Sequence, residues 1–176
     1  QKISIQQAVS LLGKHGVWIH NACNGRGTDT LSPETTRKSI SKEETFGHDI
    51  ADISELEKRL FLLVESVCAS ARSHKWKART ITLKLRYSDF DTITRAESLP
   101  PTNDDAMVSR TVTELLRKNY TRKMAVRLLG VKLSHFVEQE DMEMPLFAQD
   151  KREPALTAVD TIRKKFGEDV IHVGGV

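Results

Sequence analysis

The sequence predicts an α+β domain in which a four-stranded antiparallel sheet carries two helices on one face. Three observations support this fold class. Strand-like and helix-like patterns alternate between residues 37 and 137 in the order β-α-β-β-α-β. Both helix-like segments are apolar along one side only. The two middle strands are joined by a very short connection, which favours an antiparallel hairpin. Because two one-sided helices cover a single sheet face, the other face is expected to stay open.

The first strand and first helix follow one another directly. Residues 37–46, RKSISKEETF, alternate weakly and predict a strand. Asp52, with Glu55 three residues later, predicts a helix start. Cys68 lies on this helix, and we interpret it as a small core residue. The apolar stripe of the helix consists of Ile53, Leu56, Leu60, Leu63, Val64, Val67 and Ala71.

The second half of the domain repeats the pattern. Strands are predicted at about 78–87 and 90–98, and a second helix from around Asn103–Asp104. A last strand is predicted over 123–136. Its apolar phase switches near Gly130, which predicts a β-bulge at that glycine. The stripe of the second helix consists of Val108, Val112, Leu115 and Leu116.

The two ends of the chain differ from this middle part. Residues 4–24 have helical spacing that GKHG (13–16) interrupts, and 24–35 have the composition of a linker. After residue 138 an acidic, turn-like stretch precedes a short helix near Pro154, which Gly167 ends. Its predicted apolar stripe is Leu156, Val159, Ile162 and Phe166.

Composition excludes several classes of protein. Of 176 residues, 39% are hydrophobic and 29% charged, and no apolar run is long enough to span a membrane. Two cysteines are too few for a disulfide framework or a zinc site, and the six histidines show no metal-binding spacing. A reduced, cytoplasmic location fits these features. Because the chain starts at Gln1 within a helical pattern, we expect a piece of a longer protein.

The open face is the candidate functional surface. Lys84 and Arg86 point away from the core side of their strand, together with Thr80 and Thr82. Basic side chains neutralise phosphate, and small hydroxyls donate hydrogen bonds to it. A polar, threonine-rich face is also common on any antiparallel sheet. Basic residues expected around this face are Arg37, Lys38, Lys75, Lys77, Arg79, Lys84, Arg86, Arg95, Arg127 and Lys132.

Other chemistry has weaker support in the sequence. Mid-strand aromatic residues are missing, so contact with a duplex backbone fits better than stacking on single-stranded bases. Asp89 lies at the hairpin turn, where aspartate is favoured for local reasons. No phosphate-binding glycine loop and no Ser-His-Asp set is present, so no catalytic residue is predicted.

Four segments resemble the C-terminal part of Y-family translesion DNA polymerases of the bacterial polymerase IV branch. They are RKSISKEETF, LKLRYSDFDTITRAESL, VRLLGVKLSHF and the tail MPLF…LTAVDTIRKKFGEDVI. The resemblance implies a helical end of the thumb domain over 1–27, a linker over 28–36, a little finger domain over 37–137 and a tail over 138–176. The metal-binding palm is not among these parts, so no polymerase activity and no cofactor are expected here, whereas the parent enzyme would use Mg²⁺.

The resemblance also implies where DNA lies. In this family the little finger sheet approaches the major groove near the primer–template junction and holds the backbones of both strands. Leu128 is a departure, because relatives can carry a second arginine there. The residues implied to contact DNA are Arg37, Lys38, Ser39, Ile40, Ser41, Lys84, Arg86, Thr92, Thr94, Arg95, Arg127 and Lys132.

A second implied partner is the replication sliding clamp. Bacterial polymerases of this kind carry a short clamp-binding peptide at the place of EMPLF, where Glu143 and Met144 replace the usual glutamine and leucine while Leu146 and Phe147 match. Alternatively, these apolar residues pack back onto the domain. Pro145 disfavours a helix at Met144 and keeps the stretch extended.

Taken together, these features predict a non-catalytic DNA-binding module of an error-prone polymerase that copies past damaged bases. The first alternative is a protein-interaction module whose main partner is the sliding clamp. The second is a small phosphate-cleaving enzyme of the acylphosphatase type on the same topology. That enzyme would need an arginine in a phosphate-cradling loop beside the first strand and an asparagine on another, and the sequence has no such arrangement.

Overall fold

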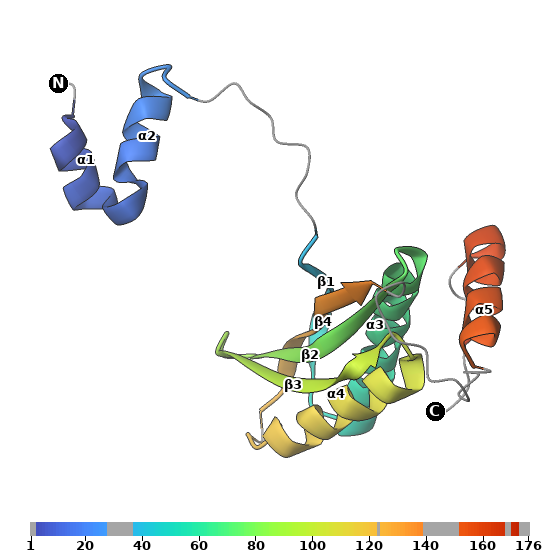
Figure 1. The fold of residues 1–176 in the computed structure, drawn as a ribbon. Helices are drawn as coiled ribbons and strands as arrows, with labels where there is room; N and C mark the ends of the chain where they lie inside the picture. The colour runs from blue at the N-terminus through green and yellow to red at the C-terminus, as the bar shows by residue number, and fades with distance from the viewer. Residues whose placement is uncertain (1–2, 28–36, 123, 139–151, 168–169, 173–176) are drawn as a thin grey trace. The chain divides into compact units, whose positions relative to one another are not determined.

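The computed structural model describes residues 3–27, 37–122, 124–138, 152–167 and 170–172 of the chain. The chain divides into two compact units, residues 1–36 and 37–176, and each is described by itself (Figure 1). The expected linker over 28–36 and the expected clamp peptide over 143–147 lie outside the described residues. None of the described helices is both long and apolar enough to cross a membrane.

The first unit is a helical hairpin of α1 (Ile5–Leu12), the 3₁₀ turn η1 (Gly13–His15) and α2 (Gly16–Cys23). The predicted interruption at GKHG is therefore a tight turn. The side chains of Ser4 and Gln7 cap the start of α1 reciprocally. A Cβ at Gly16 would lie 2.4 Å from the Ala8 carbonyl oxygen, so a glycine is required for the two helices to approach this closely.

The second unit has the predicted element order. Asp52 caps the first of its helices by accepting a hydrogen bond from the Ser54 N–H, and Asp104 caps the next by accepting from Ala106 and Met107. The elements are β1 (Ser39–Ile50), α3 (Ile53–Ser73), β2 (Trp76–Tyr87), β3 (Thr92–Thr102), α4 (Asp105–Asn119), β4 (Val126–Glu138) and α5 (Arg152–Phe166).

The four strands form one antiparallel sheet in the order β1-β4-β2-β3. The hairpin of β2 and β3 is confirmed. Strands β1 and β2, which α3 connects, are separated by β4, and strands β3 and β4, which α4 connects, are separated by β2. Each helix thus crosses over one intervening strand, as in a split β-α-β unit. Strand β4, the last strand in the sequence, therefore lies in the middle of the sheet between β1 and β2, and β1 and β3 are the edge strands.

Helices α3 and α4 cover one face of this sheet and form the core with it (Figure 1). Ile81, Leu83 and Leu85 of β2 are almost completely buried beneath the helices. Cys68 is fully buried in the same core, and burial raises the pKa of its thiol. Its interpretation as a core residue is confirmed. None of the helices that the structure describes in residues 37–172 covers the opposite face of the sheet, as the sequence predicted.

The predicted bulge at Gly130 is wrong. Gly130 pairs in regular register with Glu43 on β1 and Lys84 on β2. The register shifts instead at Arg127, because Leu128 pairs with Arg86 while Val126 pairs with Tyr87. The sequence pattern was misleading because Leu128 is an apolar residue that lies on the open face, so the apolar phase seems to switch after it.

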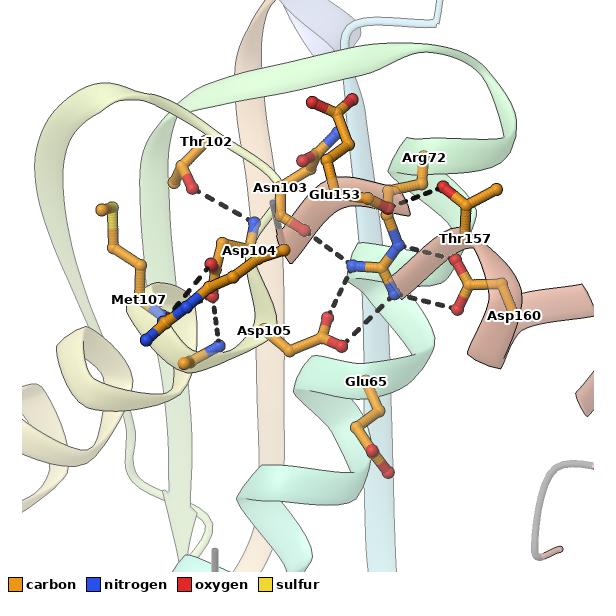
Figure 2. A network of polar contacts seen from close by, with 12 residues as sticks. Glu65, Arg72, Thr102, Asn103, Asp104, Asp105, Met107, Glu153, Thr157 and Asp160 are labelled. Carbon is orange, nitrogen blue, oxygen red and sulfur yellow. Dashed lines mark hydrogen bonds and ion pairs between the residues drawn. The ribbon is translucent and has the colours of Figure 1, made fainter. Parts of the chain in front are cut away.

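Helix α5 packs against α3 through buried ion pairs (Figure 2). The Arg72 guanidinium of α3 donates to both oxygens of Asp160 on α5, at 2.6 and 2.9 Å, and to both oxygens of Asp105 on α4, at 2.9 and 3.3 Å. Arg163 of α5 pairs in return with the buried Glu65 of α3. Each of the two helices therefore contributes one arginine that forms an ion pair with a carboxylate of the other helix.

The predicted stripe of α5 is only partly the face that docks. Leu156 and Arg163 are buried, whereas Phe166 is 61% exposed. Ile162 is also exposed. The docking face therefore follows Leu156, Asp160 and Arg163, spaced four and three residues apart. Charged side chains replaced the apolar ones that the sequence pattern had suggested, because α3 presents Glu65 and Arg72 on the surface that α5 covers.

Candidate nucleic-acid interface

The cross-strand register arranges the open face into four rows. Residues directly opposite each other in an antiparallel sheet point to the same face. Because Lys84 and Arg86 lie on the open face, their partners on the other strands do too. In order β1, β4, β2, β3, the rows are Ser39–Ser134–Thr80–Ser98, Ser41–Lys132–Thr82–Ala96, Glu43–Gly130–Lys84–Thr94 and Thr45–Leu128–Arg86–Thr92.

Hydroxyl groups accompany the basic side chains in these rows. Lys132 lies between Ser41 and Thr82 and forms no ion pair or side-chain hydrogen bond with any residue that the structure describes. Arg86 donates from Nε to the Thr92 hydroxyl at 2.8 Å, which leaves its terminal nitrogens available. These two rows therefore present cations beside small hydrogen-bonding groups.

One basic group of the face is already neutralised. Lys84 Nζ lies 2.7 Å from Glu43 Oε2, and both side chains are half-exposed. The sequence predicts Lys84 as a free cation. Its acidic partner is not evident from the sequence, because Glu43 is 41 residues away along the chain and reaches Lys84 only through the strand register.

Two predicted DNA-contacting residues do not present side chains on the open face. Arg95 shares its row with Leu83 and so points to the helix-covered side, where its Nε donates to Asn119 Oδ1 at 3.0 Å. Ile40 shares its row with Leu133 and packs in the core. The assignment of Arg95 to the open face is therefore wrong, and the side chain of Ile40 does not lie on that face either. The alternation of side chains along β3 did not predict the orientation of Arg95, because β3 is an edge strand whose polar and apolar residues do not alternate regularly.

The remaining predicted residues lie at the margins of the face. Arg37 and Lys38 are exposed and directly precede β1. Arg127 is the bulge residue of β4; it pairs with Asp49 at 3.5 Å, and its guanidinium lies 4.9 Å from the centre of the Phe90 ring. Leu128 lies on the face between Thr45 and Arg86.

The hairpin turn beside the face is stabilised locally. Asp89 accepts a hydrogen bond from the Asp91 N–H at 3.0 Å, and Arg122 pairs with both carboxylates. This agrees with the interpretation of Asp89 as a turn residue. Phe90, at φ +67°, is 64% exposed at the tip, whereas Tyr87 is buried. Within the described ranges no group of three His, Cys, Asp or Glu side chains is arranged to hold a metal ion.

Basic groups and hydroxyls on an uncovered, slightly twisted sheet are suited to contact phosphates without reading sequence. Residues 37–146 match the model of the impB/mucB/samB family C-terminal domain.

Three relatives illustrate the similarity, and each is called DNA polymerase IV. The protein from Clostridium kluyveri is 32% identical over 96% of this chain and 45% of its own length. The Halorhodospira halophila protein is 38% identical over 78% of this chain and 38% of its own length. The Caulobacter vibrioides protein is 34% identical over 93% and 41%. The chain thus spans less than half the length of these relatives.

Proposed function

The chain belongs to the impB/mucB/samB family of Y-family DNA polymerases, whose C-terminal domain it carries over residues 37–146, and from this premise we propose that it holds DNA. In this proposal residues 37–137 form a little finger domain. The domain grips the backbone of a primer–template duplex through the open face of its sheet and has no catalytic role of its own.

The observation that carries this proposal is the pair of rows around Lys132 and Arg86. Each row combines a cation with hydroxyl groups, Ser41 and Thr82 beside Lys132 and Thr92 beside Arg86. Basic side chains that bind the duplex displace counterions from its phosphates, and hydroxyl groups donate hydrogen bonds to phosphate oxygens. These rows hold no aromatic side chain on which an unpaired base could stack. Binding is therefore expected to be independent of sequence.

The proposal is tested by titrating a fluorescent primer–template duplex with the protein and following anisotropy at several salt concentrations. Arg86→Ala and Lys132→Ala should each weaken binding to every sequence alike and lower the salt slope by about one unit. Arg117→Ala is the matched control, because Arg117 pairs with Glu57 on the helical side of the unit. An open face that is not the DNA surface would leave all three variants equal to the wild type.

We propose further that the parent protein transfers nucleotides in another domain, one that corresponds to the portion of the relatives outside the match with this chain. In that domain carboxylates would hold Mg²⁺. Phosphoryl transfer to a primer end requires carboxylates that hold metal ions. A primer-extension assay on the purified chain should show no incorporated nucleotide with Mg²⁺ or Mn²⁺. We also propose a cytoplasmic location, because a polymerase that acts on bacterial chromosomal DNA works in the cytoplasm.

A second proposed partner is the sliding clamp, which rests on the sequence EMPLF alone. Two adjacent apolar side chains in a polar segment suit a preformed hydrophobic pocket. Glu143 in place of glutamine removes an amide donor, so the affinity should be weak. Leu146→Ala with Phe147→Ala should abolish binding to the cognate clamp and leave duplex binding intact. Clamp binding that survives the double substitution, or unfolding caused by it, would favour packing of this segment on the domain.

A further inference from the structure

A polar pocket of about 420 Å³ lies where the edge strand β1 passes helix α3. Strand β1 contributes residues 39–42, Arg37 lies just before the strand, and α3 contributes Ser66 and Ser70, which lie one turn apart. Ile40 and Val67 form its apolar floor. The pocket adjoins the four rows of the open face, because Ser39 and Ser41 belong to both.

The charge of this pocket is positive and unbalanced. No acidic residue is among those that line it, and the neighbouring acids of β1 are bound elsewhere, Glu43 by Lys84 at 2.7 Å and Glu44 by Arg59 at 3.4 Å. Arg37 and Lys42 have no ion pair or side-chain hydrogen bond with any described residue. Lys42 shares its row with Val131 and so extends on the side of the sheet where α3 lies.

Hydrogen-bond donors complete the pocket. The hydroxyls of Ser66 and Ser70 make no hydrogen bond within the part of the chain that the structure describes. Strand β1 pairs with β4 only, so every second backbone N–H of β1 points outward from the sheet edge. Two cations, two helix hydroxyls and outward N–H groups, without a nearby free carboxylate, match the oxygens of a phosphate group.

We propose that this pocket holds one backbone phosphate of the bound duplex, so that the DNA contact continues from the open face around the β1 edge onto α3. This inference rests on the proposed function and assigns Lys42, Ser66 and Ser70 to the DNA interface for the first time. Ser39 and Ser41 provide the continuity, because they line the pocket and also begin two rows of the open face.

The test places carboxylates in the pocket. Ser66→Glu with Ser70→Glu should weaken duplex binding in anisotropy titrations and lower the salt slope by about one unit, because the pocket would repel its phosphate. The matched control is Ser109→Glu with Thr113→Glu, which adds the same charges at the same spacing on half-buried positions of α4. Equal losses in the two double variants would overturn the proposal.

A milder substitution guards against loss of folding. Lys42→Gln removes one exposed cation and should lower affinity and salt slope, while Lys58→Gln on the exposed part of α3 should change both less. If Lys42→Gln behaves like Lys58→Gln, the pocket does not hold a phosphate of the duplex. If Arg86→Ala weakens binding while the pocket variants do not, only this inference fails; if none of them does, the proposed function fails as well.

Titration with inorganic phosphate distinguishes a site for a phosphate of the DNA backbone from a site for the free phosphate ion. Titrated into the DNA-free protein and followed by amide NMR, it should shift the signals of residues 39–42 and 66–70 only weakly, since one phosphate lacks the neighbouring contacts of a duplex. Strong shifts there at low millimolar phosphate, with duplex affinity unchanged in the pocket variants, would instead identify a site for the free ion and contradict the backbone assignment.

Discussion

Lys84 on β2 forms an ion pair with Glu43 on β1, with 2.7 Å between Lys84 Nζ and Glu43 Oε2, although strand β4 runs between them. Gly130 of β4 lies in the same row and has no side chain to block the contact. A Cβ at Gly130 would lie 2.7 Å from Glu43 Cγ and 3.4 Å from Lys84 Cβ. The glycine therefore opens the path for a pair that removes one cation from the proposed DNA surface.

Removing the acid should strengthen DNA binding. Glu43→Gln releases Lys84, so the duplex affinity should rise and the salt slope should become steeper by about one unit. Stability should change little, because both side chains are partly exposed and such pairs contribute about 0–1 kcal/mol. Glu57→Gln is the control: it removes the same charge on the helical side, where Glu57 pairs with Arg117. A similar gain in affinity from both variants would mean that only net charge matters.

A side chain at Gly130 should have a related effect. Gly130→Ala forces the Glu43 side chain aside, since its Cγ would otherwise lie 2.7 Å from the new methyl group. Lys84 is then freed, and duplex affinity should increase. Because both changes act through one ion pair, the gain should be smaller when Gly130→Ala is added to Glu43→Gln than when it is made alone. Fully additive gains would show that the glycine acts in another way.

The buried pair of Arg72 and Asp105 should be important for stability. Both side chains are nearly inaccessible, at 5% and 2% exposure. Arg72→Met leaves Asp105 without its partner, and breaking such a pair costs about 3–5 kcal/mol. Urea unfolding measures the loss. Arg117→Met, which breaks an exposed bidentate pair with Glu57, should cost far less. Comparable losses from the two substitutions would contradict the importance of burial.

The same network should give an unusual pH dependence. Burial raises the pKa of Asp105 above its ordinary value of 3.8 and outweighs the Arg72 guanidinium, which lowers this pKa; the charge of the nearby Asp160 adds a smaller rise. The pKa of Arg72 is raised as well: burial lowers it, but hydrogen bonds to the two carboxylates outweigh that effect. Both pKa values are raised, which favours the charged form of Arg72 but the neutral form of Asp105.

For Asp105 the sign follows from linkage. The folded state binds this proton more tightly than the unfolded state, so ionisation of Asp105 lowers stability as the pH rises from 3.8 through the folded pKa. Going down through the same window, the wild type should gain free energy of unfolding relative to Asp105→Asn, which has no carboxyl group to protonate. Urea unfolding of both proteins between pH 7 and pH 4 checks this. The prediction is contradicted if the free energy of unfolding of the wild type minus that of Asp105→Asn falls or stays constant as the pH is lowered.

Much of the fold could be predicted because it depends on local signals. Asp52 and Asp104 cap helices by bonding backbone N–H groups two or three residues away, so the sequence alone identifies both starts. The short SDF connection confines β2 and β3 to an antiparallel hairpin, and one-sided apolar stripes predict which sheet face the helices cover. From that face the positions of Lys84 and Arg86 on the open side follow.

What only the tertiary structure decided depends on pairing between distant segments. The order β1-β4-β2-β3 and its register bring Glu43 to Lys84, turn Arg95 toward Asn119 and place Lys42 beside Ser66. A strand pattern states which residues share a face of that strand but not which residues lie opposite, and α5 docks through ion pairs that its apolar spacing does not indicate. Local periodicity therefore determined the elements and the open face, whereas long-range register determined which charges of that face are paired within the domain and which are not.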